Sequence, residues 1–260
     1  MKRAVNPEHQ EPGRPLVALA EVYRARVTLH KRTVADGIND VLPPIPLSNT
    51  AVSLVAFARE TYLRGDYPKC ISMLEGHAFA DPRLRAEAEF ILARALLRVH
   101  RSSDVVALLG PALATYSIVD EVCTGRMLYG TALALCHEVD QGIELLVTTA
   151  ALAKSKHADR AIRAEIAYFQ GVCHWIKREY AHASAFATIA ERTNLDVLSV
   201  RATQLRAFVA LVNGQYHRAL TLFQRARQAY ARCQGRDLDL ATQIVFQIAY
   251  LEMNLSLIHI

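Results

Sequence analysis

Proline is absent from more than half of this chain. All nine prolines lie at or before Pro111, so the remaining 149 of the 260 residues contain none. Because proline breaks helices, while Ala, Leu, Arg, Glu and Gln favour them, a proline-free stretch of this composition predicts helix throughout. The chain is 52% hydrophobic and 21% charged, which allows a buried core and excludes disorder on grounds of composition.

The sequence also lacks the short motifs that are typical of enzymes and metal sites. No GxSxG, P-loop or HExxH is present, and the eleven glycines form no GxGxxG. No CxxC occurs, and the neighbours Cys136-His137 and Cys173-His174 chelate poorly because adjacent helical residues point about 100° apart. We therefore predict no enzymatic activity, no catalytic residues, no metal and no cofactor. A Ser/His/Asp or Cys/His set that meets only in space stays open as an alternative.

Neither charge nor hydropathy points to nucleic acid or membrane. The net charge is +5, but the 30 Lys and Arg residues are scattered, so we predict no direct nucleic-acid binding. The charge-free stretch from Val105 to Val119 has 15 residues, is interrupted by Gly110-Pro111 and is too short to span a bilayer. Met1-Lys2-Arg3 is not followed by an apolar segment, which argues against secretion. With five dispersed cysteines, these features predict a cytoplasmic protein with reduced thiols.

The first 47 residues divide into three short parts. Residues 1–14 are polar and are predicted to form a flexible tail. Residues 15–34 place apolar side chains such as Leu16 and Tyr23 on one face, which predicts an amphipathic helix. Pro43-Pro44-Ile45-Pro46 ends this unit and predicts an extended linker up to residue 47.

An internal period then appears over residues 48–254. Five similar turns begin at residues 65, 100, 137, 178 and 214, with separations of 35, 37, 41 and 36 residues. The first residue of each turn should tolerate a positive φ, as Gly65 and Gly214 do. The residue five places later should be small, because two helices approach closely there, and the residue four places further should be apolar. The small residues are Cys70, Val105, Gly142, Ala183 and Ala219, and the apolar residues are Leu74, Leu109, Leu146, Ala187 and Phe223.

This pattern resembles the tetratricopeptide repeat (TPR) family. The G-x-Y-x-x-A segment and the later aromatic and alanine, clearest in 201–226, carry the resemblance, which covers roughly 50–254. It implies an all-α, right-handed α-solenoid of five stacked antiparallel helical hairpins and the start of a sixth. It further implies a scaffold that binds a protein or peptide partner on the face lined by the first helix of each hairpin.

The repeats exceed the 34 residues of the standard TPR, and two turns lack both glycine and aromatic. Longer repeats of this style resemble the sensor regions of bacterial maltose-activator-type and LuxR-type regulators. An alternative function is therefore a fragment of a DNA-binding transcriptional regulator whose helix-turn-helix domain is missing.

Counting back from the turns gives candidate residues for the partner-binding groove. Arg94 and Arg98 are one helical turn apart, so both side chains can reach one acidic ligand. The Lys and Asn pattern with which some family members bind a carboxylate is not present. The alternatives are that the arginines form a solvated face and that Trp175 belongs to the core. The predicted groove residues are Arg59, Tyr62, Phe90, Arg94, Arg98, Tyr168 and Trp175.

The last six residues form a separate prediction. Residues 240–254 begin a sixth hairpin, but its second helix does not follow, and solenoids normally end on a polar cap. Leu255-Ser256-Leu257-Ile258-His259-Ile260 resembles the translated end of a sequencing-library adapter. We therefore predict that 255–260 are non-native and that the natural protein continues differently. The alternative is a genuine apolar C-terminus.

Overall fold

The computed structural model describes residues 51–193, 196–233 and 237–258. The predicted tail, first helix and linker over 1–47 lie outside these residues. All regular structure in the described ranges is helical, with no strand, which confirms the predicted all-α solenoid. No helix in the described ranges is long and apolar enough to cross a membrane.

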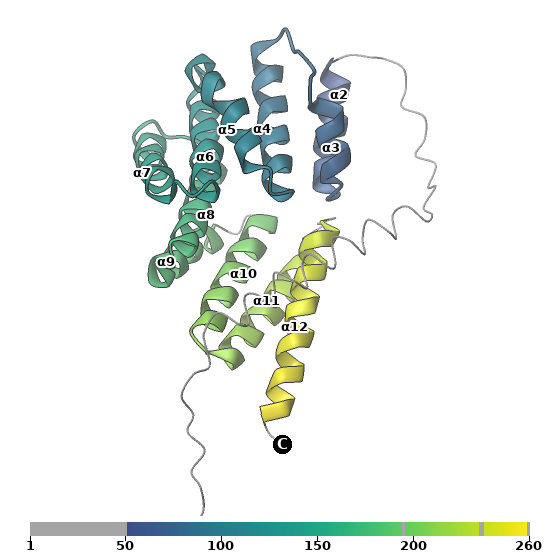
Figure 1. The fold of residues 1–260 in the computed structure, drawn as a ribbon, viewed down its shortest axis with the longest axis vertical. Coiled ribbons are helices and arrows are strands. Elements are labelled where there is room, and N and C mark those ends of the chain that lie inside the picture. Colours follow the sequence, from purple (N-terminus) through teal and green to yellow (C-terminus); the bar gives the residue numbers. More distant parts are fainter. Residues whose placement is uncertain (1–50, 194–195, 234–236, 259–260) are drawn as a thin grey trace, which may run out of the picture. The chain divides into compact units, whose positions relative to one another are not determined.

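Helices alternate between a first and a second member of each hairpin (Figure 1). The second members are α3 (Tyr67–Leu74), α5 (Ser102–Ala112), α7 (Val139–Ser155), α9 (Tyr180–Glu191) and α11 (Tyr216–Arg232), and a short 3-10 turn, Leu113–Thr115, follows α5. The first members are α2 (Ala51–Leu63), α4 (Pro82–Arg98), α6 (Val119–Leu135), α8 (Arg160–Ile176), α10 (Asp196–Val212) and α12 (Leu238–Ile258).

Aspartates and prolines set several of the helix starts. The carboxylate of Asp81 accepts hydrogen bonds from the backbone N–H groups of Arg83 and Leu84, at 2.8 and 3.5 Å. The Asp159 carboxylate accepts one from Ala161 N–H at 2.6 Å. Pro82 occupies the first turn of α4, where its missing N–H costs no helical hydrogen bond.

Each hairpin turns at the residue that the repeat spacing predicts. The five residues share a positive φ: 84° at Gly65, 62° at His100, 73° at His137, 64° at Arg178 and 71° at Gly214. In every turn the next residue donates its N–H to the carbonyl five residues earlier, as Glu179 does to His174 at 2.8 Å. This bond is the mark of the Schellman motif, which satisfies the carbonyls left free at a helix end.

The small residues predicted at the hairpin crossings are buried. Cys70, Val105, Ala183 and Ala219 are fully buried, and Gly142 is also buried. The predicted apolar residues four places further along are buried as well. The aromatic residues beside the turns differ in burial. Tyr67 is buried, whereas Tyr216 is 45% exposed and covers little of its hairpin.

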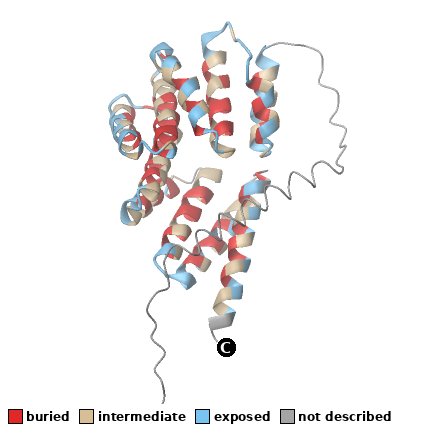
Figure 2. Cartoon of the chain, viewed as in Figure 1, coloured by how far each residue is buried: buried red, intermediate tan, exposed pale blue. Residues whose placement is uncertain are grey.

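Neighbouring hairpins stack, so that each helix buries one stripe (Figure 2). One cluster of buried side chains runs from Val55 to Cys173, and another runs from Val200 to Leu251. Small side chains, mainly alanines of α8, α9 and α10, pack between them. The predicted apolar face of α12 is buried in the second cluster, and α12 continues to Ile258 rather than ending at 254.

The closest crossing, between α6 and α7, gives a stability prediction. A Cβ atom on Gly142 would lie 2.4 Å from the carbonyl oxygen of Gly130 and 3.0 Å from the backbone N of Ala134, so the helices must separate. We expect Gly142→Ala to lower the free energy of unfolding by about 1–3 kcal/mol, measured by denaturant titration. The control is Gly110→Ala in α5, where the nearest atom would lie at 3.5 Å from the new Cβ. This change should stabilise by about 0.5–1 kcal/mol, and equal effects of both changes would contradict the assigned crossing.

The positive φ of Arg178 gives a second prediction. A residue with a Cβ pays about 1 kcal/mol in the left-handed region, and glycine does not. Arg178 is exposed, so Arg178→Gly should raise the unfolding midpoint by removing this strain. Arg227→Gly, at an exposed position in the interior of α11, should lower the free energy of unfolding by about 1 kcal/mol. A fall in the midpoint for Arg178→Gly would show that the turn does not require a left-handed residue.

Candidate partner-binding cavity

A cavity of about 610 Å³ lies among the first helices of successive hairpins. Its wall takes residues from α2, α4, α6, α8 and α10, together with Cys233 just after α11 and Asp237 just before α12. The first helix of each of the five hairpins therefore contributes at least two residues to the wall of the same cavity. Its charged and hydroxyl-bearing lining residues include Tyr62, Arg94, Arg98, Glu165, Tyr168, Arg201 and Asp237.

Arg98 is a cavity arginine for which the described part of the chain supplies no ion-pair partner. Its guanidinium lies within hydrogen-bonding reach of the Tyr62 hydroxyl, and Tyr168 and Tyr67 lie nearby. Burial raises the pKa of the Tyr168 hydroxyl, although Arg98 lowers it in part, so the tyrosine stays neutral at neutral pH. Among the described residues no carboxylate lies within ion-pair distance of Arg98. The permanent charge of the guanidinium therefore has tyrosine hydroxyl groups, rather than a carboxylate, among its described side-chain neighbours.

Arg94, one turn before Arg98, is neutralised across the cavity. Its guanidinium Nη2 lies 2.7 Å from Glu165 Oε2, so the pair joins α4 to α8. The two side chains are 24% and 29% exposed, which places them at the cavity wall rather than in open solvent. Arg94 therefore adds no net positive charge to the site.

A second ion pair joins α10 to the start of α12. Arg201 Nη2 lies 2.7 Å from Asp237 Oδ2, and the side chains are only 10% and 9% exposed. The Tyr67 hydroxyl, 170 residues earlier in the chain, donates to the same carboxylate oxygen at 3.2 Å. Leu240 N–H donates to the other oxygen at 3.1 Å. Asp237 therefore links the first hairpin, the fifth hairpin and the last helix.

The structure brings some of the predicted groove residues together and separates others. Tyr62, Arg94, Arg98 and Tyr168 line the cavity. The other three predicted residues do not line it. Arg59 and Phe90 line a second hollow of about 520 Å³, whose wall also includes Tyr62 and Arg94. Trp175 lines neither the cavity nor this second hollow.

The side chains outside the cavity have partners of their own. Arg59 forms an ion pair with Glu87 on α4, and Phe90 is buried with its ring 5.1 Å from that of Tyr116. Trp175 packs between Tyr180 and Phe208, at ring distances of 5.2 and 6.2 Å. These contacts give Phe90 and Trp175 a packing role. Of the three arginines predicted in the groove, Arg59 and Arg94 are each paired with a glutamate.

Counting along the sequence missed Glu165 and Asp237, the two carboxylates that pair with cavity arginines. Glu165 lies three residues before Tyr168 on the same face of α8, so the helical period contained a signal for it. Asp237 lies outside any helix, and its position depends on contacts with residues 36 and 170 positions away. No local pattern could have found it.

A second polar cluster lies at the turn between α8 and α9. The Glu179 carboxylate is held by His174, Lys177 and His182. Hydrogen bonds from His174 and then Lys177 lower the pKa of Glu179 to about 2. The carboxylate is therefore ionised at neutral pH.

Comparison with known proteins supports the fold rather than a function. No protein family and no curated protein matches the sequence. A thermophilic TPR protein of Thermus thermophilus is similar in structure, with a TM-score of 0.56 and 18% identity over 77% of this chain and all of that one. The chain has a TPR-like fold. TPR-like repeats of a putative kinesin light chain from Podospora anserina score 0.47 at 17% identity, covering 70% of this chain and 95% of that one. The apo form of RapI scores 0.49 at 14% identity, covering 87% and 63%.

The Arg201–Asp237 pair gives a prediction for this TPR-like chain. Removing the carboxylate leaves a nearly buried arginine unpaired and also frees the Tyr67 hydroxyl. We expect Asp237→Ala to lower the free energy of unfolding by about 3–5 kcal/mol. The control, Glu87→Ala, removes the exposed Arg59–Glu87 pair and should cost about 0–1 kcal/mol. Similar losses in the two variants would mean that Asp237 does not hold the array together.

Proposed function

We propose that this chain is a non-enzymatic TPR-like scaffold that binds an acidic segment of a protein or peptide partner in the cavity. The observation that carries the proposal is Arg98, a permanently charged group in the cavity wall with no carboxylate partner among the described residues. A cation in such a place is stabilised when a ligand supplies the anion. Cytoplasmic location, and the absence of membrane or direct nucleic-acid contact, stay predictions from the sequence.

The rest of the cavity suits one acidic side chain on an otherwise apolar segment. Arg94 and Arg201 are each paired with a carboxylate, so Arg98 is the cavity arginine with capacity for a new ion pair. Tyr62 and Tyr168 offer hydroxyl groups beside it. Apolar contacts are supplied by Leu63, Leu97, Leu135, Phe169, Val172 and Val197.

One observation favours a second candidate function. The cavity volume of about 610 Å³ falls within the range of small-molecule sites, about 300–1,000 Å³. A small organic acid would satisfy Arg98 as well as a peptide carboxylate does. This reading fits the sensor part of a larger DNA-binding regulator, the alternative suggested by the long repeats. A helix-turn-helix in the full-length open reading frame would favour it.

Replacing Arg98 tests the proposal. A library of fluorescent peptides, each with one Glu among apolar residues, is titrated with the chain, and anisotropy is measured. For the tightest peptide we expect Arg98→Gln to weaken binding roughly ten- to a hundred-fold, the loss of one charge-assisted contact of about 1.5–3 kcal/mol. Added salt should weaken wild-type binding, because part of the attraction is screened.

Arg192→Gln is the matched control, since Arg192 is exposed at the end of α9 and does not line the cavity. It should leave binding unchanged, and unfolding midpoints of both variants show that they remain folded. Binding that survives Arg98→Gln would overturn the proposal. If small organic acids bind to the cavity and no peptide of the library does, the result would favour the sensor function.

A further inference from the structure

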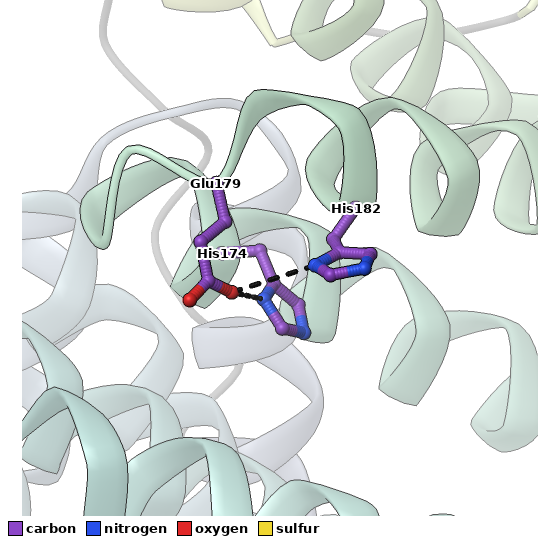
Figure 3. A group of neighbouring side chains, drawn as sticks. All are labelled: His174, Glu179 and His182. Atoms are coloured by element: carbon purple, nitrogen blue, oxygen red, sulfur yellow. Dashed lines mark hydrogen bonds and ion pairs between the residues drawn. The ribbon is translucent and has the colours of Figure 1, made fainter.

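Three metal-binding side chains meet at the turn between α8 and α9, outside the cavity wall (Figure 3). His174 lies in the last turn of α8, Glu179 is the residue just before α9, and His182 lies in the first turn of α9. Their ligand atoms all lie within 4.8 Å of one another. Both histidines present Nδ1 to the same carboxylate oxygen, Glu179 Oε2, at 2.6 Å from His174 and 3.5 Å from His182.

The backbone and a ring contact hold this cluster in place. Glu179 N–H donates to the His174 carbonyl at 2.8 Å, so these two residues are fixed side by side across the turn. The His174 imidazole stacks on the Phe186 ring at 5.3 Å with the planes 6° apart, which fixes its orientation. Glu179 makes no capping hydrogen bond to the start of α9, so its side chain is not committed to the helix.

We propose that His174, Glu179 and His182 form a binding site for a zinc-class divalent transition metal. Two imidazoles and one carboxylate are a ligand set that zinc takes when one of its four positions is left open. Nickel and copper bind imidazole as well, so the class rather than one metal is assigned. His182 is 68% exposed, which leaves the open position to water or to a group of a partner.

The two distances that involve Glu179 need only small side-chain movements to reach the geometry of a zinc site, and the two imidazole nitrogens already lie within 4.8 Å of each other. Tetrahedral zinc with bonds of about 2.0–2.1 Å separates its ligand atoms by about 3.3 Å. The His182–Glu179 distance of 3.5 Å is already close to this value. The His174–Glu179 distance must widen by roughly 0.7 Å from its 2.6 Å, which rotation of the partly exposed Glu179 side chain allows.

Charged neighbours leave room for the ion. Lys177 Nζ contacts the other carboxylate oxygen, Glu179 Oε1, at 3.1 Å, so Oε2 stays available to the metal. The Lys177 charge is also balanced by Asp140 at 2.9 Å. Cys173, next to His174 in sequence, is fully buried in the core and takes no part.

Zinc titration of the full chain tests the site. Zinc chloride is added in competition with a chromophoric zinc chelator near neutral pH, and the unfolding midpoint is followed in parallel. We expect one zinc bound per chain through this cluster and a rise in the midpoint, because a ligand that binds the native state stabilises it. Cobalt(II) should give the visible absorption of a tetrahedral site.

The variants His182→Ala and Glu179→Gln should each weaken this binding more than tenfold and abolish the rise in the midpoint. His217→Ala is the matched control: His217 is exposed in the first turn of α11, one hairpin later, and it should bind zinc as the wild type does. Circular dichroism checks that each variant remains helical. Wild-type binding that is absent, or that persists unchanged in both His182→Ala and Glu179→Gln, would overturn the proposal.

Discussion

The left-handed residue that ends the first helix of each hairpin is the constraint on which the rest of the structure depends. It reverses the chain in about three residues and fixes the start of the second helix, so the residue five places later faces the first helix at close range. A small side chain is required there, and at Gly142 not even one methyl group fits. Five such reversals place the first helices side by side, and their shared face forms the cavity wall.

This constraint also explains why the fold could be predicted from the sequence. The left-handed residue and the small residue stand at a fixed offset, so a spacing of 35 to 41 residues located all five turns. The spacing located even the three turns whose left-handed residue is not glycine. At His100, His137 and Arg178 the backbone still adopts the left-handed conformation. Glycine lowers the cost of this conformation, and the Schellman hydrogen bonds offset it where glycine is absent.

The cavity was less predictable, because its charge depends on pairs of residues that are far apart in sequence. The helical period predicted that Arg94 and Arg98 face the same space, and both line the cavity in the structure. It could not show that Glu165, 71 residues away, pairs with Arg94, while no carboxylate in the described ranges pairs with Arg98. The position of Trp175 was unpredictable for the same reason. It packs against the ring of Phe208, which lies two helices later in the chain.

The turn geometry also accounts for the placement of the histidine cluster. In the five hairpin turns the Schellman bond joins residues five apart. These pairs are Thr61–Asp66, Leu96–Arg101, Leu133–Glu138, His174–Glu179 and Ala210–Gln215. The residue three places after each pair, in the first turn of the next helix, comes close to it as His182 does to Glu179. In the other four turns these third residues are Lys69, Asp104, Gln141 and Arg218. Among these five turns, the fourth alone supplies metal-binding side chains at all three positions. The reversal that builds the array thus provides a rigid frame in each hairpin, and the residue types in the fourth convert that frame into a ligand set.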